Sequence, residues 1–443
     1  MIWRTGVLPA KWKQAVIKPF IGLGKDPSKA TRTQMSQMET RTGGELSLER
    51  SDHIAFMESG VLYVWGGCQS SSGTETVLPS DEIWFYDLDS GVWDKWEMDG
   101  EVPPALSGAS GSYHNGTLYI FGGCDTNGHT NQLYSVDLKK ESCIWKKVTD
   151  TIGTAPSPRD KHSCWVHRNR LIYFGGYGCK TIREVNNSKS FTVDEMSLVT
   201  AGNPFFRFWG WNNEVNVFDT LTSAWSEPET HGVAPAPRAS HASATLWSKG
   251  YVCGGQETMH LDIHCLDLDT WTWTPIAPSS SCIPLGRSLH TLCPASDNTL
   301  FLYGGLGITG EPMSDGWEFD TQRREWRERV HPHRDKPRLW HSACLGKDND
   351  VVVFGGCKDF SLLMDSITIL RSPLQNHCKD ILVFQNQPYP LLRLCQDCLG
   401  QNAELVQEQI TWLPPKLLTT VNKKVTFSSN CPKDKTQLDS IFV

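Results

Sequence analysis

Six times along the chain, a short apolar run ends in a pair of glycines. The intervals between successive pairs are 56, 53, 79, 50 and 51 residues, counted between their first members, which are Gly66, Gly122, Gly175, Gly254, Gly304 and Gly355. A period near fifty residues is typical of repeat architectures, in which each repeat is one supersecondary unit. The sequence therefore predicts six copies of one structural unit.

The pattern within each unit indicates short β-strands. An apolar strand and a polar turn precede the run into the glycines, and a strand with alternating apolar residues follows them. Four strands per unit, repeated about six times, favour a β-propeller over a sandwich, because radial repetition requires the same motif in every sector. Five units close with a strand whose tryptophan is expected to fill space between adjacent blades: Trp93, Trp145, Trp225, Trp273 and Trp326.

A second repeated element, Arg-x-x-His, precedes the first strand of five units, and the second unit reads LSGAS instead. Equivalent positions of successive blades lie on the same rim, so the arginines could converge on one central mouth and bind an anionic ligand. The alternative is that each arginine caps a turn or pairs with an acidic neighbour in its own blade. The pairs are Arg50/His53, Arg159/His162, Arg238/His241, Arg287/His290 and Arg338/His341.

Composition and charge exclude several classes of protein. The net charge of −7 gives no overall attraction to nucleic acid, and no apolar stretch approaches the roughly 18 to 20 residues of a membrane span. The 15 cysteines are irregularly spaced in a chain without a secretion signal. Reduced thiols and a cytoplasmic or nuclear location are therefore expected. No recurring cluster of side chains indicates a metal, a cofactor or a catalytic site.

The pattern divides the chain into four parts. Residues 1–44 are a basic extension that is expected to be disordered, and residues 45–386 are the predicted propeller. The long third interval indicates an insertion at about 180–208, expected to be a protruding loop. A helical segment at 387–427 and a disordered tail at 428–443 follow.

Helical spacing replaces the strand pattern after residue 386. Leu391, Cys395 and Leu399 are spaced i, i+4 and i+8 on one helical face, with Pro390 at the helix start. A second helix is expected to begin near Pro414, with its own apolar residues at the same spacing. Two short amphipathic helices after a completed propeller either pack on it or bind a partner.

These motifs together carry a resemblance to a known family. The glycine pair, the strand ending in Asp and the Trp strand resemble the kelch repeat, over roughly residues 48–386. The two tail helices resemble the Elongin C-binding box and the cullin-2 box. The residues that match these boxes are Pro390, Leu391, Cys395 and Leu399 in the first, and Leu413, Pro414, Leu417 and Val421 in the second.

The chain thus resembles the kelch-repeat substrate receptors of cullin-RING ubiquitin ligases. The resemblance implies an all-β, six-bladed propeller whose mouth binds the C-terminal tails of substrate proteins, typically ending in glycine. It also implies docking on Elongin B/C and on cullin-2 or cullin-5 with its RING subunit, which transfer ubiquitin, so the receptor has no catalytic residues of its own. A non-ligase kelch scaffold for protein interactions is the alternative.

The resemblance also implies a set of tail-binding residues. Those that match the family are Lys161, Tyr177, Trp211, Ser288 and Trp340. The family has two clamp arginines after the fourth glycine pair, where this chain has Gln256 and Met259. It also has Trp and Tyr where this chain has Leu289 and Cys68. Arg238 and Arg287 are the arginines expected to substitute, and whether glycine-ended tails are still recognised is left open.

Overall fold

The computed structural model describes most of the predicted propeller and the helical segment. The described residues are 48–71, 74–140, 142–186, 190–195, 207–255, 260–358, 377–402, 410 and 413–430. The predicted extension at 1–44 and all but the first residues of the predicted tail at 428–443 lie outside them. Within these ranges, no helix is long and apolar enough to cross a membrane.

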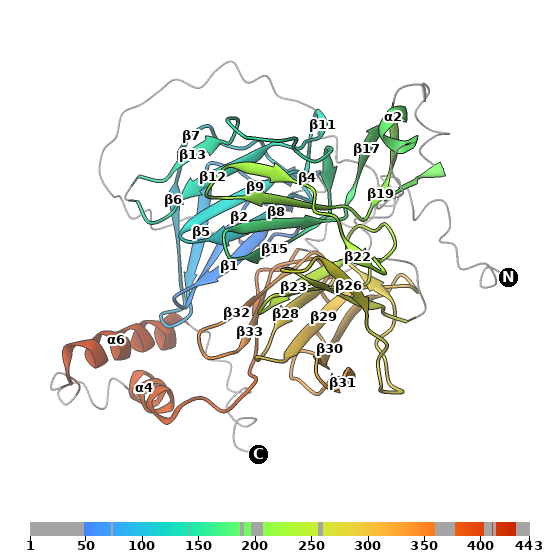
Figure 1. The fold of residues 1–443 in the computed structure, drawn as a ribbon. Coiled ribbons are helices and arrows are strands. Elements are labelled where there is room, and N and C mark those ends of the chain that lie inside the picture. The colour runs from blue at the N-terminus through green and yellow to red at the C-terminus, as the bar shows by residue number, and fades with distance from the viewer. Residues whose placement is uncertain are drawn as a thin grey trace.

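Sheets of antiparallel strands surround a common centre, as the repeat predicts (Figure 1). The first blade has the order β1-β2-β5-β6 and the second has the order β8-β9-β12-β13, with β7 parallel to β13 at its outer edge. The strands of the first blade are β1 (Ile54–Glu58), β2 (Val61–Trp65), β5 (Glu82–Asp87) and β6 (Val92–Glu97). Those of the second are β7 (Asp99–Gly100), β8 (Ser110–His114), β9 (Thr117–Phe121), β12 (Leu133–Asp137) and β13 (Ile144–Lys147).

The third and fourth blades repeat this order. The third contains β15 (Ser163–His167), β16 (Arg170–Phe174), β20 (Val215–Asp219) and β21 (Ala224–Ser226). The fourth contains β22 (His231–Gly232), β23 (Ala242–Leu246), β24 (Lys249–Cys253), β25 (Ile263–Asp267) and β26 (Thr272–Pro275).

The fifth and sixth blades differ from each other in the number of strands described. The fifth contains β27 (Arg287–Ser288), β28 (Thr291–Pro294), β29 (Thr299–Gly307), β30 (Pro312–Asp320) and β31 (Glu325–Arg329). The sixth contains three strands among the described residues, in the order β32-β33-β34. They are β32 (Ser342–Leu345), β33 (Val351–Phe354) and β34 (Ile381–Phe384). Two small hairpins extend from the first two blades: β3 (Cys68–Ser71) with β4 (Thr74–Val77), and β10 (Cys124–Asp125) with β11 (Gly128–His129).

The ring of blades is closed by its innermost strands. Each of β1, β8, β15, β23 and β28 contacts the innermost strand of the next blade, and β32 contacts β1. The apolar side chains form six main clusters, and each cluster combines residues from two neighbouring blades. The core of the protein therefore lies between the blades, which is why no blade can bury its apolar faces alone. Trp145, Trp225, Trp273 and Trp326 are buried in these clusters, and Trp93 is half-buried against another.

The glycine pairs are required by close backbone approach. Both members of every pair have a positive φ, which disfavours any residue with a Cβ. A Cβ on Gly176 would lie 2.8 Å from the carbonyl oxygen of Asp160, in the Arg-x-x-His element of the same blade. A Cβ on Gly175 would lie 2.9 Å from the carbonyl oxygen of Arg238, in the next blade. The pair therefore holds the strand end against two rim segments at once.

The insertion is more ordered than the predicted loop. Its described residues continue β17 (Tyr177–Thr181) into helix α2 (Ile182–Asn186), followed by β18 (Phe191–Val193) and β19 (Arg207–Asn212). These strands form a separate sheet in the order β14-β17-β19-β18, where β14 is Arg159–Asp160. The sheet projects beyond the third blade (Figure 1). The described residues of the insertion are therefore strands and a short helix where a loop was predicted, because strand pairing with the rim orders a segment that carries no repeat motif.

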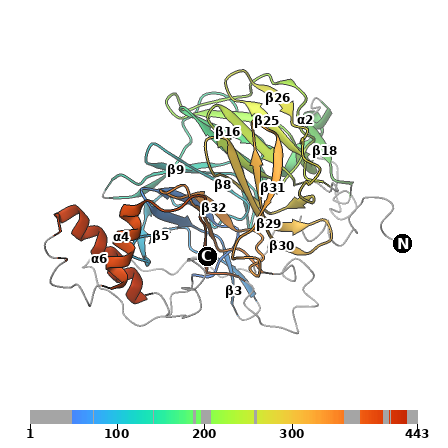
Figure 2. The ribbon, with the colours of Figure 1, turned by 90° about the horizontal axis from the view of Figure 1, so that it is seen from below.

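Two helices lie outside the propeller, beside the first and last blades (Figure 2). Helix α4 (Leu391–Gln401) begins directly after Pro390, and α6 (Pro415–Asn430) begins within the predicted proline turn. The helices pack on each other where Gly400 meets Lys424, and a Cβ on Gly400 would lie 2.4 Å from the Cβ of Lys424. The predicted helical pair after the propeller is confirmed.

Candidate functional site

A cavity of about 230 Å³ lies on the propeller axis, where the rim segments of the blades converge. It is lined by the last two residues of the five Arg-x-x-His elements and by Gly108 and Ala109 of the second blade. We call it the central cavity. The residues that precede the histidines, with their equivalent in the second blade, are here called the ring residues: Asp52, Gly108, Lys161, Ser240, Leu289 and Trp340.

The ring residues share an unusual backbone conformation. All have φ between 52° and 65°, the left-handed region that residues other than glycine rarely adopt. From Lys161 onward, each ring N–H donates to the carbonyl oxygen of the preceding ring residue, and Asp52 donates to Trp340, over 2.8 to 3.1 Å. Strain of this kind persists only where the surrounding structure enforces it, and it is frequent at ligand sites. Here the ring of hydrogen bonds holds these residues in the left-handed conformation.

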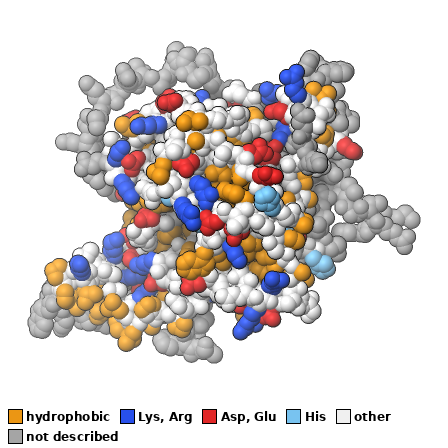
Figure 3. All heavy atoms as spheres, in the orientation of Figure 1, with side chains coloured by type: hydrophobic (Ala, Val, Ile, Leu, Met, Phe, Trp, Pro, Cys, Tyr) orange, Lys and Arg blue, Asp and Glu red, His pale blue; other side chains and the backbone are white. Residues whose placement is uncertain are grey.

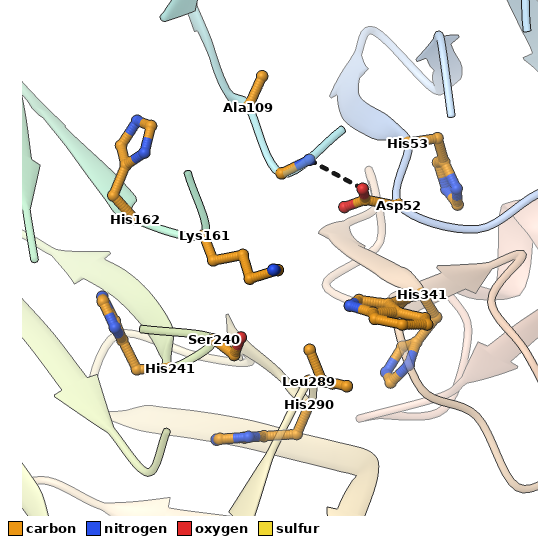
Figure 4. A pocket seen from close by; sticks show the side chains of 12 residues that line it. Asp52, His53, Ala109, Lys161, His162, Ser240, His241, Leu289, His290 and His341 are labelled. Atoms are coloured by element: carbon orange, nitrogen blue, oxygen red, sulfur yellow. Dashed lines mark hydrogen bonds between the residues drawn. The ribbon is translucent and has the colours of Figure 1, made fainter. Parts of the chain in front are cut away.

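One link of the ring uses a side chain. The amide of Gly108 donates to Oδ2 of Asp52 at 2.8 Å (Figure 4). The Ser107 hydroxyl donates to the same oxygen at 2.5 Å. Asp52 therefore joins the first blade to the second, which lacks an Arg-x-x-His element. Burial raises the pKa of the Asp52 carboxyl, and these two hydrogen bonds and Lys161 oppose the rise.

The rim histidines are structural. Each Nε2 lies within hydrogen-bonding distance of a Ser, Thr or Cys side chain of a neighbouring blade, for example 2.7 Å from Ser110 for His162 and 2.8 Å from Ser163 for His241. Burial, followed by the adjacent arginine, lowers the pKa of His162 and His341 to about 3 and that of the other rings well below the usual value. These rings are therefore uncharged at neutral pH. Within the described ranges, no group of three or more His, Cys, Asp and Glu residues could hold a metal ion.

The structure does not bring Arg238 and Arg287, which were predicted to bind the ligand, into the lining of the cavity. Each side chain is 1% exposed or less and forms a two-pronged pair with a carboxylate of its own blade. Arg238 contacts Asp262 at 3.0 and 2.7 Å, and Arg287 contacts Asp315 at 2.7 and 2.8 Å.

The same pairing recurs in other blades. The guanidinium also donates to the first glycine of the pair, at 2.9 Å for Arg238 and 3.0 Å for Arg287. Arg159 pairs with Glu214 and Arg338 with Asp380 through one carboxylate oxygen each, and Arg159 also donates to the carbonyl of Gly175. Each arginine therefore joins the rim segment to the strand ends of its blade, which was the alternative interpretation of the motif.

Lys161 reaches into the central cavity, as predicted for a ligand-binding residue (Figure 4). Its ammonium lies 3.2 Å from Oδ2 of Asp160, whose Oδ1 lies 3.3 Å from Nε2 of His129. Although burial alone would raise it, the pKa of Asp160 is held below its ordinary value by Lys161 and His129. The Lys161 ammonium is therefore positioned by a buried, ionised carboxylate.

An aromatic wall continues from this ion pair onto the inserted sheet. The His129 ring contacts those of Tyr177 and Trp209, and Tyr177 meets Trp211 edge-on at 5.5 Å. Tyr177 is buried and its hydroxyl contacts Asp194 at 3.1 Å, whereas Trp211 is half-buried. The structure thus brings two of the predicted site residues together, next to the cavity but not within its lining. Trp209 belongs to the same wall, and the period-2 alternation of β19 was the signal that could have identified it.

The opposite wall of the cavity is apolar. Leu289 and Trp340 line it, and they pack on a cluster completed by Leu306, Leu339 and Cys357. The predicted residue Trp340 is therefore in the cavity. Ser288 lies in β27, paired with Leu306 and adjacent to the lining rather than part of it.

Two ring residues were missed by the sequence reasoning. Asp52 and Ser240 both line the cavity, and the signal that could have identified them is their place before the histidine, shared with Lys161. Of the four altered family positions, Leu289 lines the cavity and Cys68 is buried beside Ser51, while Gln256 and Met259 lie outside the described residues.

The predicted docking residues form a second candidate site on the helices. Pro390, Leu391 and Cys395 are exposed, Leu399 is half-buried, and Leu391 is 76% exposed. In the second box, Pro414 is exposed, and Leu413 and Leu417 are half-buried. Val421, also predicted to contact a partner, is 1% exposed and packs inside in this conformation. Its spacing marks the buried face of α6, which a pattern of apolar residues cannot distinguish from a binding face.

Ion pairs hold the helices on the propeller. Arg393 of α4 pairs with Asp348, and Lys424 of α6 lies 3.0 Å from Asp89. Lys423 lies 2.6 Å from Asp87 of the first blade. The helices are thus attached by their charged faces while the leucines at the start of α4 remain exposed.

Comparisons with known proteins match most of the chain. The model of the KLHDC2/KLHL20/DRC7 kelch-repeats domain matches residues 53–305. Human kelch domain-containing protein 1 is 48% identical over 384 residues, covering 86% of this chain and 91% of that protein. Bovine kelch domain-containing protein 2 is 38% identical over 389 residues, with the same coverage. The solved structure of YjhT matches 77% of this chain and 96% of its own with a TM-score of 0.50 and 16% identity, which concerns the fold alone.

Proposed function

The chain belongs to the family of the kelch domain-containing proteins 1 and 2, and we propose that it is the substrate-recognition subunit of a cullin-2 or cullin-5 RING ubiquitin ligase. Its kelch propeller is a protein-interaction domain. In the proposed role, α4 and α6 dock on Elongin B/C and the cullin, and the central cavity binds the C-terminal tail of a substrate. Ubiquitin is then transferred by other subunits.

The observation that carries the docking part is the exposed leucine patch of α4. Leu391, Leu392 and Leu394 are 76%, 58% and 46% exposed, and hydrophobic side chains gather over the helical segment in Figure 3. Such a patch on a helix otherwise attached by ion pairs is favourable only when a partner covers it. An amphipathic helix that inserts its apolar residues into a groove is a common mode of partner binding.

The shape and polarity of the central cavity support the tail-binding part. Its volume of about 230 Å³ lies below the roughly 300 to 1,000 Å³ of drug-sized ligand pockets. A space of this size suits the last residues of a chain rather than a folded domain. The Lys161 ammonium has three donors, so it can bind a terminal carboxylate while it remains paired with Asp160.

Docking is tested by co-expression of the full chain with Elongin B and C. We expect the three proteins to co-purify, and we expect Leu391→Ser combined with Cys395→Phe to abolish this without changing the melting temperature, because both side chains are exposed. Leu221→Ser is a matched control, since Leu221 is 75% exposed on the third blade. If the wild-type chain does not bind Elongin B/C, the ligase proposal is wrong and the alternative of a kelch scaffold without ligase function remains.

Tail binding is tested with peptides that have a free or an amidated C-terminus. We expect the free form to bind more tightly, and we expect Lys161→Met to remove most of this difference, because it removes a charge-assisted hydrogen bond. Equal affinity for free and amidated peptides in the wild type would contradict tail recognition while leaving the docking result intact.

A further inference from the structure

The balance of charge around the central cavity favours cations. Asp52 presents its carboxylate to the cavity, where its recorded hydrogen bonds come from two neutral donors, Ser107 and Gly108. Lys161 attracts the Asp52 carboxylate, but its ammonium is itself paired with Asp160. Because burial raises the free-energy cost of an unpaired charge, a cationic group that pairs with Asp52 is stabilised there.

The arginines of the rim do not change this balance. Those of the fourth and fifth blades are paired with Asp262 and Asp315 within their own blades. Lys161 is paired with Asp160, which lies outside the lining, and also attracts Asp52, so one ammonium serves two carboxylates. A bound terminal carboxylate would add a further negative charge. A ligand that also carries a positive charge would restore the balance.

The walls fit the stem of a long basic side chain. Leu289 and Trp340 form the apolar side of the cavity, and the amide of Asp52 donates to the Trp340 carbonyl at 3.0 Å, so the carboxylate lies beside this wall. Lys and Arg bury their methylene stems along apolar surfaces and keep the charged head at a polar group. In Figure 4, Asp52, Lys161 and Leu289 all extend toward the same central space.

We propose that the central cavity selects protein tails with a lysine or arginine among their last residues, and that Asp52 is the residue that pairs with this basic side chain. The inference rests on the proposed function, because it specifies the tail that the cavity binds. The terminal carboxylate contacts Lys161, the aliphatic stem packs on Leu289 and Trp340, and the charged head reaches Asp52.

The test measures the affinity of the full chain for fluorescent peptides that end in glycine. At each of the positions before the glycine, the peptides carry in turn lysine, norleucine or glutamate. At one position, we expect lysine to bind about tenfold more tightly than norleucine, the size expected for a hydrogen bond between charged groups, and glutamate to bind most weakly. In Asp52→Asn, which keeps the shape and an acceptor oxygen, lysine and norleucine should bind equally.

Controls separate this inference from the proposed function. Asp150→Asn removes an exposed carboxylate elsewhere and should keep the preference for lysine. Equal binding of lysine and norleucine by the wild type, or a preference that survives in Asp52→Asn, overturns the inference but not tail recognition. Failure of every free-carboxylate peptide to bind overturns both, even if Elongin B/C still co-purifies. The comparison of glutamate with lysine uses the wild type alone, so it decides whether the cavity prefers a basic side chain even if Asp52→Asn does not fold.

Discussion

Arg287→Met is expected to destabilise the fifth blade. The guanidinium is buried, contacts both oxygens of Asp315 at 2.7 and 2.8 Å, and donates to Gly304 at 3.0 Å. Methionine fills a similar space but leaves the carboxylate and the glycine carbonyl without this donor. Removing one partner of a buried ion pair lowers the free energy of unfolding by about 3 to 5 kcal/mol. The lower end of this range applies because the Asp315 side chain is 23% exposed.

The assay is urea unfolding followed by tryptophan fluorescence. We expect the midpoint for Arg287→Met to fall clearly below that of the wild type, whereas Arg323→Met, at an exposed position of the same blade, should leave it unchanged. The affinity of the remaining folded protein for tail peptides should be that of the wild type. An unchanged midpoint combined with lost peptide binding would refute this reasoning and would restore Arg287 as a ligand contact.

Further predictions concern the strand ends, the pH dependence and the attachment of the helices. Gly176→Ala should lower the midpoint of thermal unfolding by the equivalent of more than about 1 kcal/mol, because φ is 105° and the new Cβ would lie 2.8 Å from a carbonyl oxygen. Burial would raise the pKa of Asp262 and Asp315, but their arginines hold it below its ordinary value. This stabilisation is therefore present above about pH 4 and is lost as the pH falls further, which urea unfolding between about pH 5 and pH 3 should reveal. Asp348→Asn, which removes the ion pair of Arg393, should increase hydrogen exchange in α4 while leaving exchange in the blade strands unchanged.

The repeat could be identified in the sequence because the same contacts recur from blade to blade. The glycine pair occurs in all six units, and the rim histidine and the closing tryptophan occur in five units each. Their spacing therefore predicted the fold, and the i, i+4 spacing after Pro390 predicted the helices. The insertion carries no such period, so its strand pairing with β14 and β17 was missed.

The direction of the rim side chains was decided only by the tertiary structure. In the sequence, the arginine and the residue two positions later are equally plausible ligand contacts, because both recur in the same element. In the structure, the backbone turns into the left-handed region at the ring residue, so Lys161 and Asp52 enter the cavity. The arginine is drawn outward to a carboxylate that is distant in sequence, as with Arg287 and Asp315.

The sequence by itself determined the six repeats, their closing tryptophans and the two helices, because these depend on contacts that are local or that recur at a fixed period. The tertiary structure decided which charged side chains are paired within the blades and which face the central cavity, because each ion pair joins residues that are distant in sequence. The glycine pairs belong to both: their spacing reveals the fold, and their close contacts hold the rim segments that form the central cavity.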